Sequence, residues 1–193
     1  MNPTTSIVIP NYRLTRMLRN CLLSIKAAKF PSYEVIVVDD ASKSYVQRYL
    51  KDLEKEGLCD KAICKAENGG FGRACNDGIA AARGKYIVLL NNDTWVHDGW
   101  LEALVARAEE AEKIGVVGSK ILFPDGAVMW GCVSFQPVRF WWHGHSCYAP
   151  EINVPRDSSS GPFCSALIKR ALFDEIGLFD ERFVNGWEDV DFC

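Results

Sequence analysis

The sequence predicts an α/β fold built on a mostly parallel sheet. Short apolar runs alternate with segments of helical periodicity through the first half of the 193 residues, and several of these runs end in polar clusters. Such alternation is typical of parallel strands joined by right-handed helical connections. Because ligands bind to these sheets beyond the carboxyl ends of the strands, the polar clusters are the first candidates for a binding site.

The elements of the first half follow one another regularly. Residues 6–9 form the first predicted strand, which Pro10 is expected to stop, and apolar residues then recur at helical spacing from 14 to 25. A strand at 34–38, a helix at 44–56 and a short strand near 62–63 come next. A glycine-rich stretch at 68–72 opens a helix that reaches Ala82, and the strand 86–90 follows.

The second half is less regular. We expect a helix over 100–108, a strand over 115–121 and a turn at 124–126. The aromatic stretch 129–160 has no clean period, and we expect it to form a second wall of mixed strands and loops over the binding cleft. A helix over 169–176, ended by Gly177, leads to the acidic segment 185–191.

Composition excludes some classes of protein. The net charge of −3 provides no basic field for a nucleic acid. The eight cysteines show neither zinc spacing nor paired clustering, so we expect reduced thiols that act as small core residues. With no signal-peptide pattern and no apolar run of membrane-span length, we expect a cytoplasmic protein; peripheral contact with the inner face of a membrane stays open.

The segment Asn91-Asn92-Asp93 is the strongest candidate for a metal site, because three side-chain oxygens follow a buried strand directly. Carboxylate and amide oxygens are the ligands that Mg²⁺ and Mn²⁺ prefer. Asn and Asp also dominate turns, so the triplet taken alone fits a turn equally well.

Three further polar clusters surround that triplet in the predicted sheet. Two follow strands, at residues 10–12 and at Asp39-Asp40, and would lie on the same edge. The third is the glycine-rich segment 68–76, which leads into a helix N-terminus, a common way to hold a phosphate by backbone N–H groups. Together these clusters predict a nucleoside-diphosphate site.

Five motifs in order make the chain resemble the family 2 glycosyltransferases, which have a GT-A fold. They are SIVIPNY at 6–12, VIVVDDAS at 35–42, NGGFGRACNDG at 68–78, LLNNDT at 89–94 and GWEDVD at 186–191. The resemblance implies one GT-A domain over 1–193, with a Rossmann-like nucleotide-sugar-binding half at 1–97 and an acceptor-side half at 98–193. Family members continue beyond the last motif, so we expect this acceptor half to be incomplete.

The resemblance also implies a role for each motif in binding the nucleotide-sugar. Asp39 would pair with the base or ribose above a floor of Pro10 and Tyr12, and Asp93 would hold Mg²⁺ or Mn²⁺. Asn91 occupies the first position of the family's Asp-x-Asp motif. Arg13 stands where many members have Asn, which implies either the loss of a hydrogen bond in the base pocket or a contact of Arg13 with a phosphate. The other residues that would line the pocket are Gly70, Gly72, Arg73, Asn76, Asp77 and Asn92.

Asp189 matches the catalytic base of the family, with Glu188 beside it and Trp187 as a sugar contact. An inverting transfer needs a carboxylate near the acceptor hydroxyl and a cation near the departing diphosphate. The implied donor is a UDP- or dTDP-sugar, and the implied acceptor is a glycan or a lipid-linked glycan, as in the rhamnosyltransferase-like branch that builds surface polysaccharides. The alternative is a non-catalytic nucleotide-sugar-binding module.

Other interpretations explain less of the sequence. A receiver domain would leave the glycine-rich segment unexplained, and that segment lacks the spacing of a dinucleotide fingerprint. His143 and His145 are candidate metal ligands that fit a Trp-rich wall better. Trp130, Trp141 and Trp142 fit core packing better than sugar stacking. Asp180 and Glu181 are expected to organise a turn.

Overall fold

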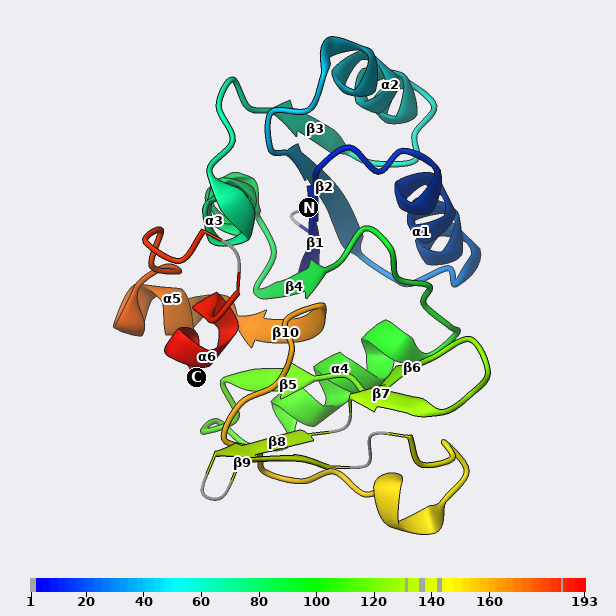
Figure 1. The fold of residues 1–193 in the computed structure, drawn as a ribbon, viewed down its shortest axis with the longest axis vertical. Coiled ribbons are helices and arrows are strands. Elements are labelled where there is room, and N and C mark those ends of the chain that lie inside the picture. Colours follow the sequence, from blue (N-terminus) through cyan, green and yellow to red (C-terminus); the bar gives the residue numbers. More distant parts are fainter. Residues whose placement is uncertain (1–2, 131, 136–137, 142–143, 185) are drawn as a thin grey trace.

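A six-stranded mixed sheet forms the centre of the protein (Figure 1). This computed structural model describes residues 3–130, 132–135, 138–141, 144–184 and 186–193. The strand order is β3-β2-β1-β4-β10-β5, and β10 runs antiparallel to both of its neighbours while the first four strands are parallel. The sheet consists of β1 (Thr5–Asn11), β2 (Tyr33–Asp39), β3 (Lys61–Cys64), β4 (Tyr86–Leu90), β5 (Val116–Gly118) and β10 (Ser165–Lys169). The predicted mostly parallel α/β sheet is confirmed.

Helices cover both faces of this sheet. They are α1 (Arg16–Ala27), α2 (Ser44–Lys55), α3 (Gly70–Ala81), α4 (Trp100–Glu109), α5 (Arg170–Ile176) and α6 (Glu188–Phe192). Because side chains alternate along a strand, Ile7 and Ile9 of β1 pack with the core formed by α1, α2 and α4, whereas Val8 packs with α3 and α5. The second core also contains Phe163, Phe173 and Phe179, against which Phe192 of α6 packs.

Pro10 does not stop the first strand, contrary to the prediction. β1 pairs with β2 as far as Asn11 and Asp39, but it pairs with β4 only as far as Val8 and Leu89. The backbone of Asn11 faces β2, since its carbonyl accepts the Asp40 N–H at 2.8 Å. Pro10 therefore faces the side where the pairing with β4 has already ended, and its missing N–H costs no ladder bond.

The strand predicted over 115–121 is two strands in different sheets. β5 ends at Gly118, and the Ser119 N–H then bonds the Ser165 carbonyl at 2.9 Å. β6 (Ile121–Leu122) pairs instead with β7 (Val128–Trp130) across the predicted 124–126 turn. The remaining described elements of this region are the hairpin of β8 (Cys132–Phe135) and β9 (Val138–Trp141) and the short 3-10 helix η1 (Pro150–Ile152). The predicted mixture of strands and loops is confirmed.

The cysteines agree in part with the prediction. Cys21, Cys59 and Cys75 are buried, and seven cysteines whose side chains are described are free thiols. Cys193 is exposed, so it is not a core residue. Within the described ranges, no helix combines the length and apolar character that crossing a membrane requires.

Gly70 is required where the glycine-rich motif meets the segment before the last motif. It begins α3 with φ of +85°, and a Cβ added there would lie 1.9 Å from the Val184 carbonyl oxygen. The neighbouring Phe71 N–H donates to this same carbonyl at 3.2 Å. A glycine at 70 thus lets the segment before α6 pack directly on the α3 N-terminus.

Replacing Gly70 by Ala is expected to destabilise the fold more than replacing Gly57. Both residues have positive φ, so each Ala variant should lose roughly 1–2 kcal/mol through backbone strain. Nothing lies within 4 Å of a Cβ at Gly57, whereas Gly70→Ala adds an overpacking cost of about 1–3 kcal/mol. Urea unfolding of both variants measures the difference, and equal losses would contradict this close approach.

Candidate functional site

A buried chain of hydrogen bonds joins the carboxyl ends of three strands. Asn92, after β4, donates its amide to Asn11 Oδ1 at 2.7 Å, and Asn11 in turn donates to Asp39 Oδ1 at 3.0 Å. The Ser42 N–H completes the chain by donating to Asp39 Oδ2 at 2.8 Å. Asp39 has no exposed surface. The Asp39 carboxylate thus positions Asn11 and Ser42, and its contact with the base or ribose of a nucleotide stays a prediction.

Tyr12 and Arg13 form the accessible surface beside this chain. Tyr12 is 41% exposed, whereas Pro10 is buried, so Tyr12 alone can provide the predicted floor. Arg13 has φ of +66°, a conformation that Asn adopts readily, and its N–H donates to Ser42 Oγ at 2.8 Å. Its guanidinium carbon lies 4.4 Å from the centre of the Tyr12 ring, which makes a cation–π contact.

The glycine-rich segment does not present free N–H groups to a phosphate, contrary to the prediction. The Asp40 carboxylate accepts the Gly69 N–H at 2.9 Å and the Gly70 N–H at 2.8 Å. Lys65 Nζ lies 3.0 Å from Asp40 Oδ1 and 3.1 Å from Asp77 Oδ2. A carboxylate of the protein itself thus occupies the positive N-terminus of α3, for the same electrostatic reason that a phosphate would bind there.

Asn76 is a structural residue rather than part of a pocket lining. It is buried, its amide donates to the Phe179 carbonyl at 2.9 Å, and its Oδ1 accepts the Phe179 N–H at 3.0 Å. Gly72 is also buried, and a Cβ there would lie 3.7 Å from Cβ of Glu188. Arg73 is half-exposed and its Nε lies 3.5 Å from Glu181, so it alone of these three can face a ligand.

Asn91 and Asp93 present oxygens at the end of β4. The Thr94 hydroxyl closes a turn here by donating to the Asn91 carbonyl at 2.7 Å. The triplet 91–93 therefore forms a turn, and its side-chain oxygens remain candidates for a metal site. Asn91 Oδ1 is buried and has no hydrogen-bond partner within the described part of the chain. The Asp93 carboxylate is exposed. No cluster of three His, Cys, Asp or Glu residues suited to a metal occurs among the described residues.

Glu188 and Asp189 begin α6 and lie in different environments. Glu188 is 7% exposed with its Oε2 unpartnered among the described residues, while Asp189 is half-buried and its Oδ1 accepts the Val190 N–H at 2.9 Å. Burial, with a smaller contribution from the Asp189 charge, raises the pKa of Glu188. Before them, Trp187 is 68% exposed at φ of +75°, a strained conformation for a bulky residue.

Cys164 connects the two acidic motifs, and sequence reasoning missed it. Its carbonyl accepts the Asn91 N–H at 2.9 Å, which joins the end of β4 to the residue before β10. Burial first, then the Asp93 and Asp189 charges, raise the pKa of the Cys164 thiol to about 11. Both carboxylates therefore lie near one thiol, which stays protonated at neutral pH. The bridging role of Asn11 was also not predicted, although Asn11 belongs to the strand-end cluster at residues 10–12.

Several other predicted residues lie away from this arrangement. Asp180 accepts the Arg182 N–H at 2.9 Å and pairs with its guanidinium, which confirms the expected turn. His145 is exposed and its carbonyl accepts the Val128 N–H. Trp130 is half-buried. Trp142, His143 and Asn185 lie outside the described residues, as does the side chain of Trp141.

Glu188→Gln is expected to stabilise the protein at neutral pH. Because folding raises the Glu188 pKa, the folded state favours the protonated acid, and stability falls as pH rises from the usual value of about 4.3 through the folded pKa. The Gln variant should therefore be more stable than the unchanged protein at about pH 7 and equally stable below about pH 4. Melting curves at both pH values test this, with the exposed Glu175→Gln as control; a gain independent of pH would contradict the burial of a charge.

The amino-acid pattern of the family described as "Glycosyl transferase family 2" matches residues 6–177. The O-antigen biosynthesis protein RfbC of Myxococcus xanthus is 28% identical over 207 residues, which cover 98% of this chain and 16% of that protein. The chain thus spans a small part of this relative.

Two solved structures share the fold over the whole chain. The mannosyltransferase PcManGT from Pyrobaculum calidifontis, in complex with GDP-Man and Mn²⁺, gives a TM-score of 0.71 at 18% identity, with 51% of its own chain covered. S. aureus TarS 1-349 in complex with UDP gives 0.70 at 18% identity, with 54% covered. These likenesses confirm the predicted GT-A fold. Since the family pattern covers most of the sequence, this chain belongs to glycosyl transferase family 2.

Proposed function

We propose that this chain moves a sugar from a nucleotide-sugar donor to a hydroxyl of a glycan or lipid-linked acceptor. The observation that carries the proposal is that Asp93, at the carboxyl edge of the sheet, and Asp189, at the start of α6, both act electrostatically on Cys164, the residue before β10. A transferase needs a carboxylate on each side of the reacting carbon, one toward the leaving diphosphate and one toward the acceptor. Asp93 and Asp189, which are far apart in the sequence and both act on the half-buried Cys164 thiol, supply such a pair.

The residues at the end of β4 fit a divalent cation. Asn91 Oδ1 is a buried oxygen without a partner in the described chain, and Asp93 adds one exposed carboxylate. Mg²⁺ commonly takes one or two carboxylates and completes its shell with water and phosphate oxygens, so Asp93 and Asn91 would hold it together with the donor. A bound Mg²⁺ or Mn²⁺ would neutralise charge on the departing diphosphate.

Asp189 is the better general base of the acidic pair. Its half-buried carboxylate is more accessible than that of Glu188, whose burial favours the neutral acid. Asp189 would accept the acceptor proton during attack, while Glu188 supports the start of α6 from below. The Cys164 thiol is protonated at neutral pH, which disfavours Cys164 as a nucleophile. We propose a single displacement with inversion, with Asp189 as the base.

Tyr12 and Arg13 are the groups that best fit the nucleotide. The half-exposed Tyr12 ring offers a stacking face, and the Arg13 guanidinium above it carries a charge suited to phosphate. Family neighbours were solved with GDP-Man and with UDP, so the base must be chosen by experiment. We propose UDP- or dTDP-sugars as donors.

Removal of the Asp93 carboxylate should abolish the metal dependence of nucleotide binding. UDP or dTDP is expected to raise the melting temperature of the unchanged protein only when Mg²⁺ or Mn²⁺ is present. Asp93→Ala should lose this dependence, while Asp98→Ala, which removes an exposed carboxylate five residues away, should retain it. An Asp93→Ala protein that still responds to the metal would rule out this cation site.

Asp189→Asn should separate binding from transfer. We expect an unchanged thermal shift with nucleotide and metal, but a loss of turnover of about 10²–10⁴-fold, the range for a general base. Asp191→Asn, two residues away and exposed, is the matched control. Release of UDP or dTDP from a panel of nucleotide-sugars measures turnover. Equal loss of binding and turnover would contradict the base role, and binding without turnover in the unchanged protein would favour the binding-module alternative.

A further inference from the structure

The charges of this chain are segregated along its sequence. Residues 1–33 contain five Lys and Arg residues and no Asp or Glu, so all 25 acidic residues follow Tyr33. The protein therefore carries a cationic segment despite its net charge of −3. This segment consists of β1, the turn after it and α1, and its basic residues are Arg13, Arg16, Arg19, Lys26 and Lys29.

The basic residues surround the outer face of α1. Leu18, Cys21, Leu22 and Ile25 face the sheet and are buried. At 100° per residue, the opposite side of the helix consists of Arg16, Asn20, Leu23 and Ala27, all exposed. Lys26 lies in the last turn of the same helix and Lys29 in the turn that follows it, and both are exposed. α1 thus presents an outer face with cations at both ends and apolar residues between them.

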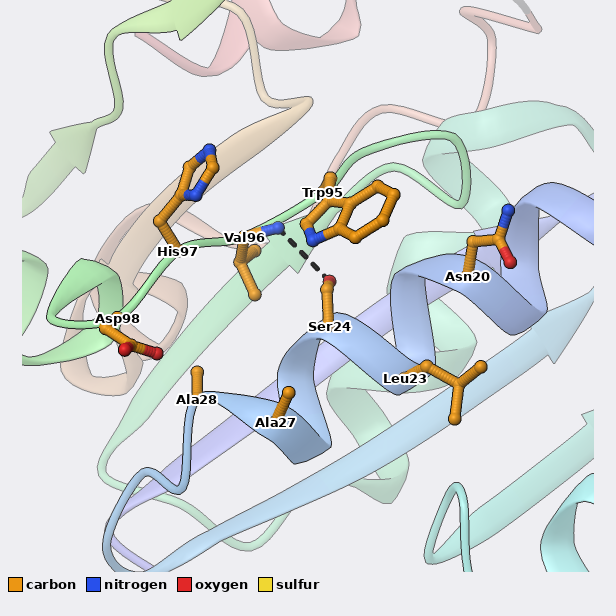
Figure 2. Close-up of a pocket in the computed structure, with 9 residues that line it drawn as sticks. All are labelled: Asn20, Leu23, Ser24, Ala27, Ala28, Trp95, Val96, His97 and Asp98. Carbon is orange, nitrogen blue, oxygen red and sulfur yellow. Dashed lines mark hydrogen bonds between the residues drawn. The ribbon is translucent and has the colours of Figure 1, made fainter.

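Trp95 extends the apolar part of this face. The Val96 N–H donates to Ser24 Oγ at 3.2 Å and Val96 is buried, which fixes the segment after β4 against α1 and turns Trp95 outward. Figure 2 shows Trp95 across from Asn20 and Ser24 at a hollow of about 620 Å³ that α1 and residues 95–98 line together. Trp95 is 71% exposed, and Met17 and Leu23 are 52% and 43% exposed.

The acids near this face neutralise little of its charge. Glu56 pairs with Arg19 at 2.9 Å, and Asp98 lies at the far end of the hollow. Among the described residues, no carboxylate forms an ion pair with Arg16, Lys26 or Lys29. Lys26 reaches only the Gly57 carbonyl, at 3.4 Å. Three cations therefore remain available to an external anionic surface.

We propose that the α1 face, defined as Arg16, Met17, Leu23, Lys26, Lys29 and Trp95, docks the protein onto an anionic lipid bilayer. Exposed Trp, Leu and Met beside Lys and Arg are what an interfacial helix uses: the apolar groups enter the headgroup boundary and the cations attract anionic lipids. Trp95 follows Asp93 by two residues, so docking would hold the candidate donor site close to the membrane surface. The proposal goes beyond sugar transfer and does not depend on it.

Co-sedimentation with vesicles tests the charge requirement. The protein should bind phosphatidylcholine vesicles that contain phosphatidylglycerol, and binding should weaken with added salt. The Lys26→Gln, Lys29→Gln double variant should bind about 25-fold more weakly, since each basic residue contributes about fivefold. Lys61→Gln, Lys113→Gln is the matched control, because it removes two exposed lysines elsewhere and should bind as the unchanged protein does. Equal weakening of both variants, or equal binding to pure phosphatidylcholine, would overturn the proposal.

Quenching by brominated phosphatidylcholine in the same vesicles tests whether Trp95 enters the bilayer. Trp95→Phe should remove most of the quenching, whereas Trp187→Phe, at an exposed tryptophan on the other face of the sheet, should leave it unchanged. The melting temperature of each variant serves as the folding control. Absence of quenching would overturn the proposal. If methyl glycosides then change the Trp95 fluorescence, the ligand of this face is a saccharide rather than a bilayer.

Discussion

The buried hydrogen-bond chain through Asn92, Asn11 and Asp39 is the constraint on which the candidate site depends. It links the carboxyl ends of β4, β1 and β2. The buried Asp39 carboxylate accepts hydrogen bonds from the Asn11 amide, the Ser42 N–H and, at 3.5 Å, the Gln47 amide. A buried carboxylate is tolerated only when it is satisfied in this way. Through Ser42, the same chain fixes the Arg13 backbone in its left-handed conformation and so places the Tyr12 ring.

A second buried carboxylate ties the last motif to the first half of the chain. Asp40 holds the N-terminus of α3, and Gly70 there leaves room for the carbonyl of Val184. Further along α3, Asn76 clamps both backbone groups of Phe179. These contacts bring α6 over α3. As a result, Asp189 lies near the strand end that carries Asp93, although most of the chain separates them in sequence.

The start of α6 combines features that lower stability. Glu188 is buried without a full set of partners in the described chain, and Trp187 adopts a left-handed conformation that costs free energy. Such features persist when the surrounding structure over-determines them, and they cluster at functional sites. The Phe163, Phe173, Phe179 and Phe192 cluster provides that surrounding structure. The residues proposed for catalysis thus destabilise the fold, and the phenylalanine cluster that packs beneath them stabilises it.

The sequence by itself determined the order of strands and helices in the first half, the mostly parallel sheet and the family, because periodicity and short motifs are local properties of the chain. It did not predict β10, the antiparallel strand between β4 and β5. Only the tertiary structure decided the partners of the polar groups: Asp40 rather than a phosphate accepts the Gly69 and Gly70 N–H groups, and Asp39 and Asn76 bind the protein itself. It also brought Asp93 and Asp189 near enough to Cys164 for both charges to raise the pKa of its thiol, and it carried β1 past Pro10. A hydrogen-bond donor takes whichever acceptor folding brings near it, and that choice rests on contacts between residues far apart in the sequence.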